Sequence, residues 1–162
     1  TAPIQRTWSK LIRTALVSQG QHVNKESIQA FQVTRLGRSN GDTCLLELFP
    51  LPSPSINNWI YGEFSKIPML ASRKMYHSQI GDFRINRLSE MIIDHKPKAV
   101  VFYGKTYEEY WLKICKKNGP WVSNEIGKTL KVNDTTFFIV PHPRVSILIK
   151  SHASGFLLTS SS

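Results

Sequence analysis

Apolar positions recur with helical spacing in two parts of the chain. Between residues 4 and 18, Trp8, Leu11, Ile12, Ala15 and Leu16 follow one another at spacings that place them on one face of an amphipathic helix. Residues 70–95 repeat this pattern over a longer stretch, with the apolar stripe Ile85, Leu88, Met91 and Ile92, and Pro97 stops it. The mixed, polar residues 21–42 between these helices are predicted to form a loop.

Short continuous apolar runs predict three buried strands, at residues 43–49, 99–103 and 135–140. The third is the second arm of a hairpin whose first arm is 127–132 and whose turn is Asn133-Asp134. Helices are predicted at 106–117, with Thr106 as the N-cap, and at 145–158. Strands that alternate with helices predict a single α/β domain over residues 1–162, with three α/β/α layers and a short, mainly parallel central sheet.

The residues that follow the three predicted strands are candidates for a ligand site, because ligands of open α/β sheets bind at the carboxyl ends of the strands. These ends carry the proline-rich loop 50–58, the sequence Tyr103-Gly104-Lys105 and the sequence Pro141-His142-Pro143-Arg144. Pro143 disfavours helical geometry at His142, so this histidine is expected in a loop at the strand mouth. We therefore expect the three ends to face one cleft.

The chain is strongly basic. Its 21 Lys and Arg against 11 Asp and Glu give a formal charge of +10, and its pI is about 9.8. This balance is typical of nucleic-acid-binding domains, although a basic surface can also serve solubility alone. No apolar run is long enough for a membrane span, residues 1–20 do not have the pattern of a signal peptide, and Cys44 and Cys115 are predicted to be buried free thiols. We expect an intracellular protein of the cytoplasm, nucleoid or nucleus.

Several common chemical motifs are absent from the sequence. Gly127-Lys128-Thr129 lacks the first glycine of a phosphate-binding loop, because Val122 stands there, and it leads into a strand. The five histidines show no metal-ligand spacing, so neither a metal nor a cofactor is expected. Asn133-Asp134-Thr135 fits a glycosylation pattern that we attribute to chance.

The apolar strand that ends in Pro141-His142-Pro143 resembles the closing motif of the uracil-DNA glycosylase superfamily, an apolar strand followed by His-Pro-Ser. The order of other segments is similar to that family: a helix such as 6–11, a strand and proline-rich loop such as 45–54, and a strand such as 96–104. Together the likeness covers residues 6–147. It implies a three-layer α/β fold and a monomer that removes a deaminated or damaged base, such as uracil, from DNA.

The resemblance assigns roles to particular residues. His142 would donate a hydrogen bond to the departing base, and Glu47 lies near the position of an asparagine that reads the base. Val145, Ile147 or Leu148 would be the wedge that fills the gap left by the flipped nucleotide, unless these three residues are helix core. The contacts to DNA would come from Pro50, Pro52, Ser53, Ser55, Tyr103, Gly104, Lys105, Pro143, Arg144 and Ser146.

Two features depart from the family pattern. The loop that carries the water-activating residue should precede Trp8, and residues 1–7 do not contain it, so either the natural chain has more residues before Thr1 or catalysis is absent. Arg144 stands where the family usually has serine. A non-catalytic nucleic-acid-binding domain and a small-molecule enzyme therefore remain alternatives.

The aromatic and basic residues Tyr103, Lys105, Tyr107, Tyr110 and Trp111 could stack on bases, although Tyr107 and Trp111 have the spacing of a packing pair.

Overall fold

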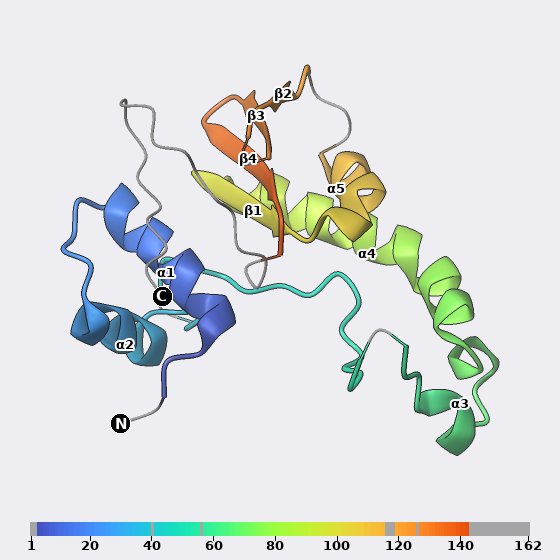
Figure 1. The fold of residues 1–162 in the computed structure, drawn as a ribbon. Coiled ribbons are helices and arrows are strands. Elements are labelled where there is room, and N and C mark those ends of the chain that lie inside the picture. The colour runs from blue at the N-terminus through green and yellow to red at the C-terminus, as the bar shows by residue number, and fades with distance from the viewer. Residues whose placement is uncertain (1–2, 40, 56, 116–118, 126, 143–162) are drawn as a thin grey trace.

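A computed structural model describes residues 3–39, 41–55, 57–115, 119–125 and 127–142 (Figure 1). It is a mixed α/β structure, as the sequence predicts. Its helices and strands are α1 (Arg6–Ser18), α2 (Lys25–Thr34), α3 (Tyr61–Phe64), η1 (Pro68–Leu70), α4 (Arg73–His95), β1 (Ala99–Tyr103), η2 (Lys105–Tyr107), α5 (Glu108–Ile114), β2 (Val122–Ser123), β3 (Lys128–Val132) and β4 (Thr135–Val140). The predicted helix 145–158 lies outside the described residues.

The four described strands form one sheet in the order β1-β4-β3-β2. β1 and β4 are parallel, whereas β3 pairs antiparallel with both β4 and β2. The hairpin predicted at Asn133-Asp134 is confirmed, and Asn133 adopts the positive φ of 52° that such a turn requires. The mainly parallel sheet that we expected is not confirmed, because only one of these three pairings is parallel.

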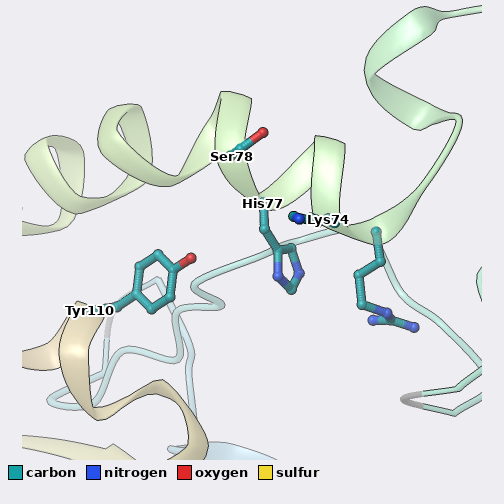
Figure 2. A pocket seen from close by; sticks show the side chains of 5 residues that line it. Lys74, His77, Ser78 and Tyr110 are labelled. Atoms are coloured by element: carbon teal, nitrogen blue, oxygen red, sulfur yellow. The ribbon is translucent and has the colours of Figure 1, made fainter.

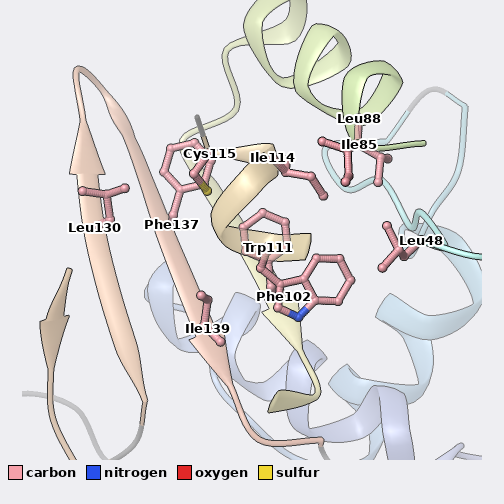
Figure 3. Close-up of a cluster of buried hydrophobic side chains, with 10 residues drawn as sticks. All are labelled: Leu48, Ile85, Leu88, Phe102, Trp111, Ile114, Cys115, Leu130, Phe137 and Ile139. Carbon is pink, nitrogen blue, oxygen red and sulfur yellow. The ribbon is translucent and has the colours of Figure 1, made fainter. Parts of the chain in front are cut away.

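One face of the sheet packs against α4 and α5 (Figure 1). Phe102 of β1 and Phe137 and Ile139 of β4 meet Trp111 of α5 in this core, and Phe102 and Trp111 stack with ring centroids 4.9 Å apart (Figure 3). On the opposite face of β1, Val101 is 40% exposed, so no helix covers the strand at this position. The predicted three-layer arrangement is therefore not confirmed.

Helices α1 and α2 form a hairpin with a core of its own. Ile12 and Leu16 of α1 pack against Ile28 and Phe31 of α2. The sequence predicted α1 but missed α2 within the segment read as a loop. The signal was present, because Asn24 caps the helix in a reciprocal pair with Ser27 and is followed by apolar residues at helical spacing.

The long helix α4 confirms the prediction for residues 70–95, apart from the first turn. Ser72 is its N-cap, accepting a hydrogen bond from the Met75 amide, and the chain leaves the helix at Lys96, where φ is 44°. The helix α5 is shorter than predicted and begins after the 3₁₀ turn η2. Thr106 lies inside that turn and does not cap α5, whose N-cap position is Tyr107.

The predicted strand at residues 43–49 is wrong. The segment is an irregular connection in which Leu45 and Leu46 are 42% and 45% exposed and only Leu48 is buried. Two carbonyl groups of this segment accept hydrogen bonds from a side chain instead of a neighbouring strand. The Arg84 side chain of α4 donates to Leu48 O at 3.1 Å and to Glu47 O at 2.5 Å. The apolar run is therefore fastened to a helix by a guanidinium instead of joining the sheet.

The two cysteines differ in their surroundings. Cys115 is buried as expected, and burial raises the pKa of its thiol to about 12, whereas Cys44 is exposed, contrary to the prediction. The exposure of Cys44 follows from the irregular course of residues 43–49. Among the helices that the structure describes, none has the length and apolar character that crossing a bilayer requires.

Candidate functional site

The carboxyl ends of β1 and β4 bring Tyr103 and His142 together, as the sequence predicts for parallel neighbours. Tyr103 pairs with Val140 in the last register position, and the Gly104 amide extends the ladder to Val140 O at 3.0 Å. The Tyr103 ring meets the His142 ring at 5.7 Å and the Trp8 ring of α1 at 6.2 Å, both edge to face. With Glu47, these residues form what we call the sheet-end cluster.

Glu47 belongs to the sheet-end cluster through its charge and its fixed backbone. Burial raises the pKa of Tyr103, and the negative charge of Glu47 raises it further, so the carboxylate acts on the phenol. The hydrogen bond from Arg84 to the Glu47 carbonyl holds this exposed residue in place. A histidine and a phenol thus meet where the two parallel strands end, and the charge of a carboxylate acts on the phenol.

The turn after β1 is fixed by the core beneath it. Gly104 has a φ of 100°, a conformation that favours glycine, and its carbonyl accepts a hydrogen bond of 3.0 Å from Trp111 Nε1. Lys105 follows as an exposed residue at the start of η2. The core tryptophan therefore positions the backbone on which Tyr103 stands.

The proline-rich loop does not join the sheet-end cluster. The Arg73 side chain, at the start of α4, donates to Ser53 Oγ at 2.8 Å, Ser55 O at 2.9 Å and Asn58 O at 3.2 Å. Glu47 is held by Arg84, eleven residues further along the same helix, which corresponds to roughly 16 Å at the usual helical rise. In Figure 1, residues 50–55 and 57–58 run toward α3, apart from the end of β4. The expected convergence of three loops on one cleft is therefore not seen. The proline-rich loop, with the candidate residues Pro50, Pro52, Ser53 and Ser55, is held at the start of α4 and not at the ends of β1 and β4.

A pocket that the sequence did not predict lies between α4 and α5. It has a volume of about 530 Å³ and is lined by Arg73, Lys74, His77, Ser78 and Tyr110; we call it the α4 pocket. Figure 2 shows the His77 ring and the Tyr110 hydroxyl directed toward the same space from the two helices. The sequence signal was the group Arg73, Lys74, His77 and Ser78 within six residues. This group indicates a site only when α5 brings Tyr110 opposite it.

The His77 ring stacks on Phe49, with centroids 3.8 Å apart and planes 12° from parallel. Phe49 also meets the rings of Tyr76, Tyr107 and Tyr110. Burial lowers the pKa of His77 from its ordinary value of 6.5, and the positive charge of Arg73 lowers it further. The imidazole is therefore neutral at pH 7.

This shifted pKa predicts a loss of stability in mild acid. Since unfolded His77 binds a proton at a higher pH than folded His77, its contribution to stability is complete above about pH 6.5 and declines as the pH falls toward the lowered folded pKa. The check is urea denaturation of the wild type and of His77→Phe, which keeps a ring on Phe49 but cannot titrate. We expect the wild type to lose more stability than His77→Phe between pH 7.5 and 5.5, and an equal loss would contradict the assignment.

Other candidate residues have less direct placements. Tyr107 and Trp111 contact each other edge to face at 6.2 Å, which confirms the predicted packing pair. Pro143, Arg144 and Ser146, and the wedge candidates Val145, Ile147 and Leu148, lie outside the described residues. Within the described ranges, no group of three or more His, Cys, Asp or Glu side chains could hold a metal ion.

Comparisons with known proteins do not identify a relative. No protein-family model, no curated protein and no solved structure matches the chain.

Proposed function

We propose that the protein binds DNA and removes a deaminated or damaged base, such as uracil, by hydrolysing its N-glycosidic bond at the sheet-end cluster. The observation that carries the proposal is the contact between Tyr103 and His142 at the carboxyl ends of the parallel strands β1 and β4, where the negative charge of Glu47 also acts on Tyr103. The resemblance of the strand and its Pro141-His142-Pro143 ending to the glycosylase closing motif supports the same reading.

The proposed chemistry uses the sheet-end cluster to stabilise a leaving group. The bond between the sugar C1′ and the base nitrogen breaks, and its electron pair stays on the base. His142 donates a hydrogen bond to the base oxygen on which negative charge develops, a contact that strengthens as the reaction proceeds. The hydroxyl of a water adds to C1′, and the proton of that water ends on the released base. Glu47 accepts a hydrogen bond from the N–H edge of the base, and the Tyr103 ring borders the base.

The proposed function also leads us to propose a layer arrangement, an oligomeric state and a cellular compartment. The complete architecture has three layers, in which α1 and α2 form the layer opposite α4 and α5. The contact between Trp8 of α1 and Tyr103 of β1 supports this arrangement. We propose that the protein acts as a monomer in an intracellular compartment, where free thiols such as Cys44 persist.

Binding to DNA is expected to depend strongly on salt. The net charge of +10 favours phosphate contacts, and binding through phosphates releases counterions, so added salt opposes it. Raising the salt concentration from about 50 to about 200 mM should weaken binding to a uracil-containing duplex by at least about tenfold. Fluorescence anisotropy of a labelled oligonucleotide measures this change. Undetectable or salt-independent binding would contradict the proposal that the protein binds DNA.

A non-catalytic nucleic-acid-binding domain is a second candidate function. The position of the proline-rich loop favours it, because Arg73 ties Ser53 and Ser55 to the start of α4 and away from His142. In the family that the chain resembles, such a loop compresses the DNA backbone beside the flipped base. Tight DNA binding without release of uracil, hypoxanthine or xanthine would favour this candidate over the enzyme.

A further inference from the structure

The α4 pocket carries chemistry that base excision at the sheet-end cluster does not use. Its lining contains two cationic side chains, a hydroxyl, a neutral imidazole and a phenol, and no carboxylate. Such a lining suits a ligand that combines negative charge with an aromatic ring. The pocket is open to solvent, and its volume of about 530 Å³ leaves room for more than a single small anion.

The two cationic side chains of the pocket differ in their surroundings, because one is held by several contacts and the other is exposed. Three hydrogen bonds from Arg73 Nη2 to the proline-rich loop and the position of its guanidinium over the Trp59 ring, 5.2 Å from the centroid, fix this charge. Lys74 is exposed and makes no hydrogen bond or ion pair within the described part of the chain. A fixed guanidinium beside an exposed ammonium is a suitable pair of charges for a phosphate.

A residue outside the pocket lining supports the aromatic side of the pocket. Phe49 stacks under His77, so the imidazole presents a ring of fixed orientation to the pocket. Tyr110 comes within reach because Gly81 lets α5 approach α4, where an added Cβ would lie 3.3 Å from Tyr110 Cε1. The Tyr110 hydroxyl has no hydrogen-bond partner among the residues that the structure describes. A base could stack or hydrogen-bond here without displacing an existing contact.

We propose that the α4 pocket binds one undamaged nucleotide of the DNA strand, with its phosphate at Arg73 and Lys74 and its base against His77 and Tyr110. This inference rests on the proposed DNA binding and adds a second contact point to it. Arg84, which holds Glu47 and Leu48, lies seven residues beyond His77 on α4, or roughly 10 Å along the helix. About three stacked nucleotides of one strand would span that length of α4.

The first test compares two substitutions that remove the same charge. Lys74→Gln should weaken binding to an eight-nucleotide oligothymidylate by about fivefold or more, measured by anisotropy at constant salt. Lys131→Gln, at an exposed position on β3, should change it by less than about twofold. His77→Ala should weaken binding, whereas Tyr110→Phe should weaken it less because the ring remains. Equal effects of Lys74→Gln and Lys131→Gln would overturn the proposal.

The second test locates the nucleotide. The same oligonucleotide with one photoreactive 5-iodouracil should crosslink to the segment that contains His77 or Tyr110, as mapped by peptide mass spectrometry, in both the wild type and His142→Ala. A crosslink confined to other segments would overturn the proposal. So would equal affinity for thymidine monophosphate and the oligonucleotide, since a strand would then contribute nothing. A selective Lys74→Gln effect without release of any base would contradict base excision but support the pocket.

Discussion

Replacement of His142 by alanine is expected to lower the rate of base release by about a hundredfold or more, while folding and DNA affinity change little. The reason is that the hydrogen bond from His142 matters most when negative charge develops on the departing base, so its loss raises the barrier and leaves the bound state almost unaffected. The measurement is single-turnover release of uracil, hypoxanthine or xanthine from oligonucleotides that contain one such base, with excess protein.

His22→Ala is the matched control for this change. His22 is exposed in the connection between α1 and α2, far along the chain from β4, and its loss should leave the rate unchanged. Thermal unfolding of both variants shows whether the fold survives. Equal rates for the wild type and His142→Ala would remove His142 from the reaction, even if the protein binds DNA.

Elements that satisfy their own hydrogen bonds, or pair with a neighbour across a tight turn, were predictable from the sequence. The apolar stripe of α4, the strand β1 and the hairpin of β3 and β4 are specified by periodicity and by turn residues close to them. The placement of Tyr103 and His142 side by side followed from the same strands, because parallel neighbours end at the same edge.

The segment 43–49 could not be predicted in the same way. A short apolar run is compatible with a strand or with an irregular segment, and the outcome depends on which donors reach its carbonyl groups. Here the donor is Arg84 of α4, which is distant in the sequence. The sequence gives no local sign of that contact, so the effect of the Glu47 charge on Tyr103 emerged only with the fold.

The α4 pocket was beyond sequence analysis for a related reason. Lys74 and His77 continue the face of the apolar stripe of α4 toward the start of the helix, but as polar residues beyond the last apolar position they give no sign of what they face. Their significance depends on Phe49 and Tyr110, which reach them from two other segments. A site of this kind is defined by tertiary packing, and the spacing of its residues along the chain carries little information.

The core also offers a test of how the sheet-end cluster is supported. Trp111 is 8% exposed, stacks on Phe102 and donates to the Gly104 carbonyl, so it joins the core to the turn behind Tyr103. Trp111→Ala should destabilise the protein by about 3–5 kcal/mol, because it removes a large buried side chain. Chemical denaturation followed by circular dichroism measures this loss.

Trp111→Phe separates the hydrogen bond from the packing. The smaller ring keeps part of the stacking on Phe102 but leaves the Gly104 carbonyl without its indole donor, at a cost of about 1–3 kcal/mol. Trp121→Phe is the matched control, because the buried Trp121 Nε1 has no hydrogen-bond partner in the described structure and its removal should cost less. Since the lost contact holds the turn after Tyr103, Trp111→Phe should also slow base release more than Trp121→Phe. Equal losses of stability in the two variants would show that the indole contact to Gly104 does not support the turn.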